Sequence, residues 1–145
     1  MRVVLPPLPK SITKVVLTDP KLGGVNMSRK ELEEWGEDPR HRFASTPTGL
    51  DSLRRLPLLL RKKRWTEEDR EFARKVLGFN RRHIQQVLDA EVLHGGKGGF
   101  GPEVRKSGWS KRAIALRNWG HDPSSWNSPL YAADAAWVER NDART

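Results

Sequence analysis

The sequence predicts a mainly α protein, a compact helical domain of four to five helices with an extended proline-rich N-terminal arm. Apolar residues recur at helical spacing in several segments, and good N-cap residues precede these segments. The pattern Trp-Gly-x-Asp-Pro also occurs twice, each time closing such a segment. The 145 residues suit one domain. We expect an arm over 1–25, a helical core domain over 26–123, and a C-terminal helix and tail over 124–145.

The first 25 residues do not have a helical pattern. Pro6, Pro7 and Pro9 favour an extended polyproline conformation, and residues 12–17 are β-prone but lack a strand to pair with. This segment is predicted to be an arm or an edge element. The first helix is expected over residues 29–35, because Ser28 and a glutamate three residues later form a capping box.

The next helices differ in how clearly their ends are marked. Residues 40–49 are polar and are predicted to form a loop with a short helical turn after Pro39. Leu50, Leu53 and Leu56 then follow at helical spacing, and Pro57 is expected to break, kink or restart that helix.

The longest predicted helix begins after Thr66, an N-cap followed by three acidic residues. Its apolar stripe is expected to contain the main residues Phe72, Val76, Phe79, His83 and Val87, flanked by Ala73, Leu77, Ile84 and Leu88. At about 100° per residue, Arg70, Arg74 and Arg81 fall on the opposite side, and Lys75 and Arg82 lie beside them. One face is therefore predicted to be core and the other basic.

Beyond this helix, residues 95–101 contain five glycines and are predicted to form a hinge loop. Alternatively, the loop places Lys97 and Phe100 on a nucleic acid. A Walker phosphate loop is excluded because its Ser or Thr and its preceding strand are missing. Two further helices are expected, over residues 111–119 and from Ser128 to Val138.

The doubled pattern spans residues 35–39 and 119–123 and indicates a helix, a tight corner and a second helix. Gly36 and Gly120 are expected to adopt the left-handed conformation that ends a helix. The Asp-Pro pair can open the following helix, because Asp accepts a backbone N–H and Pro suits the first helical position. The two Trp side chains either pack at the corner or stack on a base.

Positive charge is the most informative feature of the composition. The net charge is +9, and residues 52–82 contain eleven basic and four acidic side chains, which leaves +7. Such clustering is typical of a surface that contacts phosphates, although basic helical faces also occur beside acidic protein partners and in thermophilic proteins. The candidate nucleic-acid-binding residues are Arg54, Arg55, Arg61, Lys62, Lys63, Arg64, Arg70, Arg74, Arg81, Arg82 and Lys97.

No catalytic residue, metal site or cofactor is predicted. The chain has no cysteine, and its four histidines lack metal-ligand spacing. A nuclease built from His83, His121 and Asp122 is one alternative. We nevertheless expect no enzyme, because the sequence has no reactive groups at a spacing that would bring them together.

The chain is expected to be intracellular, either cytoplasmic or, if it is viral, part of a virion. Its longest apolar run, 56–60, is too short to span a bilayer, and its first residues do not resemble a signal peptide.

Three blocks of the chain carry a resemblance to a family of small uncharacterised bacterial, fungal and viral proteins. The blocks are Asn26-Met27-Ser28 with Glu31, Leu32 and Trp35, then residues 76–83, then Ala115 to Pro123 with its Asn-Trp-Gly-His-Asp-Pro close. The resemblance covers about residues 25–123, and some members carry a general DNA-binding label.

The leading expectation is a non-enzymatic protein that binds nucleic acid, DNA in the first place, largely through phosphate contacts. The alternative is a structural subunit of an assembly, a viral capsid or accessory protein whose arm and tail contact neighbouring protein subunits. A third possibility is a small regulator that binds an acidic surface of another protein.

Overall fold

The computed structural model describes residues 5–42, 46–94 and 111–123, without the side chains of 87–94 and 111. Within these ranges the chain forms five α-helices, two 3₁₀ helices and no strand, which confirms the mainly α prediction. The glycine loop with Lys97 and the predicted C-terminal helix and tail lie outside the described residues.

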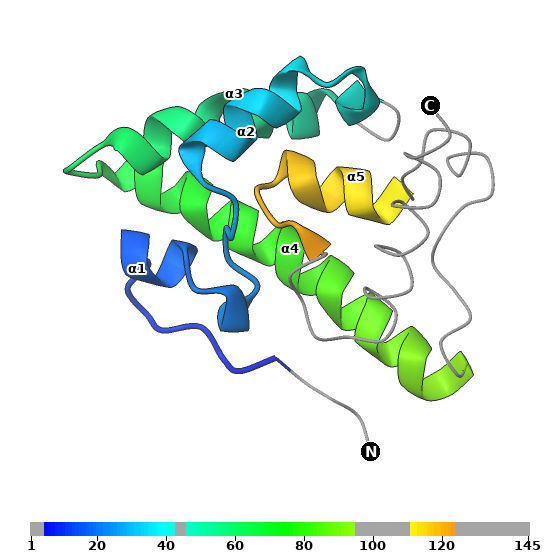
Figure 1. The fold of residues 1–145 in the computed structure, drawn as a ribbon. Coiled ribbons are helices and arrows are strands. Elements are labelled where there is room, and N and C mark those ends of the chain that lie inside the picture. Colours follow the sequence, from blue (N-terminus) through cyan, green and yellow to red (C-terminus); the bar gives the residue numbers. More distant parts are fainter. Residues whose placement is uncertain (1–4, 43–45, 95–110, 124–145) are drawn as a thin grey trace.

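The N-terminal segment packs on the domain. The prediction that it has no helix is wrong at residues 14–17 and 20–22, whereas the proline-rich residues 5–9 have neither helix nor strand. The segment forms α1 (Lys14–Leu17) and the 3₁₀ helix η1 (Pro20–Leu22). Leu5, Ile12 and Leu17 are buried, and α1 contacts the long helix α4 (Figure 1). The single helical turn of α1 buries Leu17 and leaves Val15 exposed, so these β-prone residues need no partner strand.

The first predicted helix is present as α2 (Arg29–Glu37). The N–H of Ser28 donates to Glu31 Oε1 and the N–H of Glu31 donates to Ser28 Oγ, each at 3.1 Å, so the capping box is confirmed. The helix buries Leu32 and Trp35 and is followed by the 3₁₀ helix η2 (Pro39–Arg42), the short turn expected after Pro39.

Helix α3 (Pro47–Arg61) begins earlier than the leucine spacing indicated. Thr46 is its N-cap and accepts the N–H of Gly49 at 3.1 Å, so residues 46–49 are not loop. The helix continues through Pro57, which therefore neither ends nor restarts it. Its buried leucines are Leu53, Leu56 and Leu59.

Helix α4 (Glu67–His94) begins directly after Thr66 as predicted, with reciprocal hydrogen bonds between Thr66 and Asp69. Its buried face, however, is rotated relative to the expected stripe. The fully buried positions are Ala73, Val76, Leu77, Asn80 and Ile84, whereas Phe79 and His83 are only partly buried. The reason is Asn80, a polar residue inside the core that donates to the Trp119 carbonyl at 3.1 Å.

Helix α5 (Lys111–Asn118) lies among the other helices and contacts α2, α3 and α4 (Figure 1). Its C-terminus is a Schellman motif, in which the N–H of Gly120 donates to Arg117 O and that of His121 to Leu116 O. Gly120 has the predicted left-handed conformation with φ of +81°. Gly36 does not, because it lies inside α2, so that part of the corner prediction is wrong.

The two corners interlock through buried hydrogen bonds. The indole N–H of Trp35 donates to Asn118 Oδ1 at 2.8 Å, and Asn118 Nδ2 donates to the His41 carbonyl at 2.9 Å. The Gly120 carbonyl accepts the backbone N–H groups of Asn26 and Met27. The doubled pattern therefore joins the first and last described parts of the domain.

Candidate nucleic-acid interface

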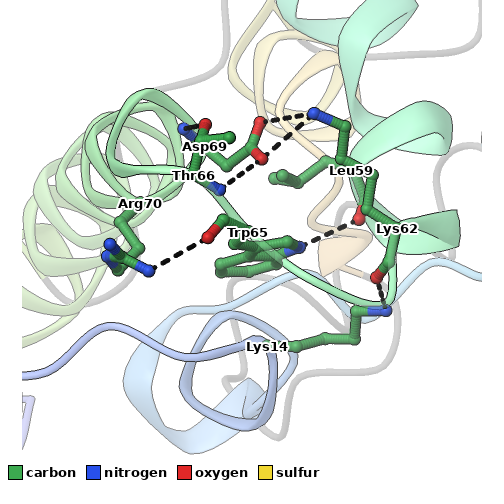
Figure 2. A network of polar contacts seen from close by, with 7 residues as sticks. All are labelled: Lys14, Leu59, Lys62, Trp65, Thr66, Asp69 and Arg70. Atoms are coloured by element: carbon green, nitrogen blue, oxygen red, sulfur yellow. Dashed lines mark hydrogen bonds and ion pairs between the residues drawn. The ribbon is translucent and has the colours of Figure 1, made fainter.

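The strongest concentration of cations lies in the turn between α3 and α4, residues 61–65, which we call the basic turn. The last carbonyls of a helix have no partner within the helix, and here side chains satisfy them. The Lys14 ammonium donates to the Leu60 carbonyl at 2.8 Å. It also donates to the Lys62 carbonyl at 2.6 Å, and the Trp65 indole N–H donates to the Leu59 carbonyl at 3.2 Å (Figure 2). Lys14 of the N-terminal segment and Trp65 of the turn itself therefore hold the backbone of the turn in place.

Two carboxylates in the first turn of α4 are already paired with cations. Lys62 Nζ lies 3.1 Å from both carboxylate oxygens of Asp69 (Figure 2), and the guanidinium of Arg70 lies 2.9 Å from Glu67 Oε2. The pKa of Asp69 is lowered, first by the hydrogen bond from the Thr66 N–H and then by Lys62. Each pair also cancels one positive charge of the cluster, so the field of the basic turn comes mainly from its other cations.

Five of the predicted contact residues are exposed and make neither a hydrogen bond nor an ion pair within the described part of the chain. Three of them lie in the basic turn and two on α4; they are Arg61, Lys63, Arg64, Arg74 and Arg82. A cation without an intramolecular partner can bind a phosphate without first losing a contact.

The other predicted cations within the described residues are engaged. Arg54 and Arg55 both pair with Asp51, and the Arg55 guanidinium lies 3.9 Å from the centre of the Phe72 ring. These exposed pairs are weak and can exchange with a ligand. Lys62 pairs with Asp69 and Arg70 with Glu67.

Arg81 does not belong to the exposed basic face that the helical spacing predicted. Its guanidinium donates to the carbonyls of Leu22 at 3.0 Å and Pro6 at 2.6 Å, and burial lowers its pKa. Because the core of α4 is rotated toward Ala73 and Leu77, Arg81 lies at the core edge and fastens the N-terminal segment to α4.

A groove of about 580 Å³ lies beside α4, at the start of α3. The rings of Phe79 and Trp119 stack there with centroids 4.6 Å apart and an 18° angle between planes. Its described lining consists of Thr46, Thr48, Lys75, Gly78, Phe79, Arg82 and Trp119. Sequence reasoning did not identify this groove, although Lys75, Phe79 and Arg82 share one helical face at spacings of four and three.

The two histidines of the hypothetical nuclease are buried or partly buried in the fold. His121 is completely buried, its Nδ1 lies 2.9 Å from the Gly24 carbonyl oxygen, and burial lowers its pKa. Asp122 pairs with Arg117 at 3.1 Å. The place of His83 in the predicted apolar stripe favours a hydrogen-bonded imidazole, but its ring makes no hydrogen bond to a described residue. Burial, Arg112 and Arg82 lower its pKa to about 4.

Comparisons of this chain with family models, curated proteins and solved structures find no match. The resemblance of residues 25–123 to a family of small uncharacterised proteins therefore stays a prediction. Among the described helices, none combines the length and apolar character needed to cross a membrane. No three His, Asp or Glu side chains within the described ranges are grouped to hold a metal ion.

Proposed function

We propose that this protein is a non-enzymatic nucleic-acid-binding protein that contacts phosphates through the basic turn and the adjoining face of α4. The observation that carries the proposal is a set of five exposed cations that pair with no described residue: Arg61, Lys63, Arg64, Arg74 and Arg82. Phosphate contacts of this kind position a protein on DNA but do not read its sequence.

The anchoring of the turn supports this proposal. Lys14 and Trp65 satisfy the final carbonyls of α3, so the backbone that carries Arg61, Lys63 and Arg64 is fixed before any ligand binds. Preorganised cations lose less conformational entropy on binding than cations on a loose loop. Each phosphate that they neutralise releases counterions, which makes the affinity dependent on salt.

The test is a salt titration of binding to duplex DNA of arbitrary sequence. Replacing Arg61, Lys63 and Arg64 together by Ala removes three unpaired cations. We expect the slope of log K against log salt to become shallower by about 2 to 3, at about 0.9 per lost phosphate contact. The binding constants are measured by fluorescence anisotropy at several salt concentrations.

The matched control replaces Arg29, Lys30 and Arg42 by Ala, three exposed cations on α2 and η2. It lowers the net charge by the same amount at another place. If both triple variants flatten the slope equally, only net charge matters and the proposed interface is wrong. A wild-type protein without salt-dependent binding would contradict the function as a whole.

A structural subunit of an assembly is the second candidate, and one observation favours it. Leu50 and Leu58 are 38% and 53% exposed and line an open groove of about 600 Å³ between α2 and α3. Exposed leucines beside a groove are typical of a protein contact. Light scattering without nucleic acid tests this reading: a defined oligomer that Leu58→Glu dissociates supports it, and a monomer at all concentrations contradicts it.

A further inference from the structure

The indole N–H of Trp119 is a nearly buried donor that has no acceptor among the described residues. Trp119 is 7% exposed and lines the groove beside α4, and its indole N–H makes no hydrogen bond to a described residue. By contrast, the indole N–H groups of Trp35 and Trp65 both have acceptors. Because a buried indole N–H is usually bonded, this donor indicates that the groove receives an acceptor from a ligand.

The donor lies at the N-terminus of α3. A Cβ atom placed on Gly49, in the first turn of this helix, would lie 3.5 Å from Trp119 Nε1 and 3.6 Å from Thr46 Oγ1. The indole nitrogen and the hydroxyl of the N-cap therefore flank the same glycine. Because the N-terminal end of a helix carries about half a positive charge, an acceptor that reaches this indole N–H is favoured if it is negative.

The first turn of α3 supplies further donors to the groove. Pro47 has no N–H, and the N–H groups of the next turn residues Gly49 and Leu50 bind the N-cap residue. The N–H of Thr48 makes no hydrogen bond to a described residue, and the exposed side chains of Thr46 and Thr48 line the groove. Open N–H groups at a helix N-terminus, with hydroxyls beside them, are typical phosphate ligands.

Two cations line the groove on its α4 side. Lys75 and Arg82 are exposed and pair with no described residue, and the described lining contains no carboxylate. The ring of His83 packs against Phe79 of the groove, and its pKa reports the sign of the local field. Burial lowers this pKa first, and Arg112 and Arg82 lower it further, to about 4. The groove therefore attracts an anion.

The groove recognises its anion by oxygen atoms and not by a ring. The Phe79 ring is covered by Trp119, with centroids 4.6 Å apart, and by His83, with centroids 4.2 Å apart, so it offers no face to a base. The donors come from α3, from α4 and from the second corner. Such a spread suits the tetrahedral oxygens of a phosphate group better than the planar pair of a carboxylate.

We infer that this groove is a phosphate-binding site, in which the N–H groups of Trp119 and Thr48 donate to phosphate oxygens and Lys75 and Arg82 balance the charge. It lies at the opposite end of the 15-residue helix α3 from the basic turn, about 22 Å away along the helix axis. A free phosphate ion and a phosphate of a nucleic-acid chain share this chemistry. The inference therefore does not depend on the proposed function; Arg82 serves both and is left unchanged in the tests.

Gly49 offers a way to block the donors without disturbing the fold. Its φ is not positive, and the contacts of 3.5 and 3.6 Å that a Cβ atom would make are ordinary van der Waals distances, so Gly49→Ala fits the helix. The new methyl group occupies the space beside Trp119 Nε1 and Thr46 Oγ1. Gly36→Ala is the matched control, because it adds the same methyl group to a helical glycine of α2, with its nearest atom 4.0 Å away.

The indole N–H resonance of Trp119 measures binding directly, once it is connected to the Trp119 backbone by NMR. Sodium phosphate is titrated into the full chain at neutral pH, with sodium chloride adjusted to keep the ionic strength constant. We expect a saturable shift of the Trp119 resonance, whereas the resonances of Trp35 and Trp65, whose N–H groups have acceptors, stay in place.

The variants test which atoms make the site. Gly49→Ala should weaken phosphate binding by about tenfold, because it displaces a hydrogen bond to a charged group, and Gly36→Ala should not change it. Thermal unfolding establishes that both variants fold. If Gly49→Ala does not fold, Lys75→Gln replaces it, with an expected loss of about threefold.

A duplex without terminal phosphates distinguishes the two sources of the phosphate group. If the natural ligand is a nucleic-acid chain, the duplex shifts the Trp119 resonance at a lower phosphate concentration than the free ion does, and Gly49→Ala weakens duplex binding. If it is a free phosphate, the duplex leaves the resonance in place and Gly49→Ala binds duplex like the wild type.

The outcomes also separate this site from the proposed function. A Trp119 resonance that moves with neither ligand, or no more than those of Trp35 and Trp65, overturns the site and leaves the basic turn untouched. A protein that binds inorganic phosphate in the groove but no duplex keeps the site and contradicts the proposed function.

Discussion

The two Trp-Gly-x-Asp-Pro corners share a sequence pattern but not a geometry. Gly36 continues α2, and a Cβ atom there would meet only Leu53 at 4.0 Å. Gly120 has φ of +81°, and a Cβ atom there would lie 2.9 Å from Val25 Cγ2. The second corner therefore requires glycine, whereas the first merely tolerates it.

The indoles of the two corners differ in the same way. The Trp35 N–H is bound to Asn118 inside the core, while the Trp119 N–H is left at the groove. The indole of the first corner is thus used up in the core, whereas the indole of the second corner also supplies one wall of the groove beside α4. A repeated motif fixes a change of chain direction but not the role of its side chains.

The largest expected difference between the corners is in their glycines. Gly120→Ala should lower the free energy of unfolding by about 2 to 4 kcal/mol, because it combines a left-handed φ with a clash against Val25. Gly36→Ala should raise it by about 0.5 to 1 kcal/mol, the ordinary gain in helix propensity. Urea denaturation measures both, and equal effects would show that the two corners are equivalent after all.

Replacing the indoles should give the next largest difference. Trp35→Phe removes the donor to Asn118 Oδ1 and leaves that buried acceptor without this bond, at a cost of about 1 to 3 kcal/mol beyond the lost ring volume. Trp119→Phe breaks no hydrogen bond to a described residue and should cost about 1 kcal/mol less. Chemical denaturation of both variants checks this, and a larger loss for Trp119→Phe contradicts it.

His121 of the second corner stands where the first corner has Glu37. This buried histidine makes the stability of the fold sensitive to mild acid. Burial lowers the pKa of His121, and that of His83 is about 4, so both take up protons more readily once unfolded. Their stabilisation is complete above about pH 6.5 and falls as the pH drops from there toward the folded pKa.

We expect a loss of about 1 kcal/mol between pH 6.5 and 5, discounted because His83 is partly exposed. Unfolding curves at several pH values measure this loss. His83→Gln should flatten the dependence, whereas an unchanged slope in this variant would remove His83 from the explanation.

The smallest effect is expected at the acidic residue of the first corner. Asp38 accepts hydrogen bonds from the Arg40 guanidinium, which is the main reason that its pKa lies below the ordinary value. Because both side chains are about one quarter exposed, Arg40→Leu should cost less than about 1 kcal/mol. An NMR titration should show the pKa of Asp38 rising toward its ordinary value, and no rise would mean that Arg40 is not the cause.

Local signals explain which parts of the fold could be predicted. The caps at Ser28 and Thr66 and the left-handed Gly120 depend on neighbouring residues, and the sequence predicts them correctly. The start of α3 is not predicted, although Thr46 and Pro47 form an N-cap and first-position pair like the Asp-Pro pairs of the corners. The polar residues around Thr46 favour a loop in the sequence.

Partners distant in the chain explain what could not be predicted. Asn80 lies in the core because the Trp119 carbonyl, 39 residues away, accepts its amide, and Arg81 binds carbonyls 59 and 75 residues away. The charge count located the basic turn, but which of its cations are paired depends on folded geometry. The groove joins α3, α4 and the second corner, so no single stretch of sequence contains it.

The attachment of the second corner to the N-terminal segment also determines when the domain can form. Asn26 exchanges hydrogen bonds with Asp122, 96 residues away, and His121 lies against Gly24. Contacts of such separation form slowly, because a long loop must close before they can stabilise anything. During synthesis the basic turn emerges well before residues 119–122, so the groove beside α4 cannot be complete until the second corner has been made and has folded.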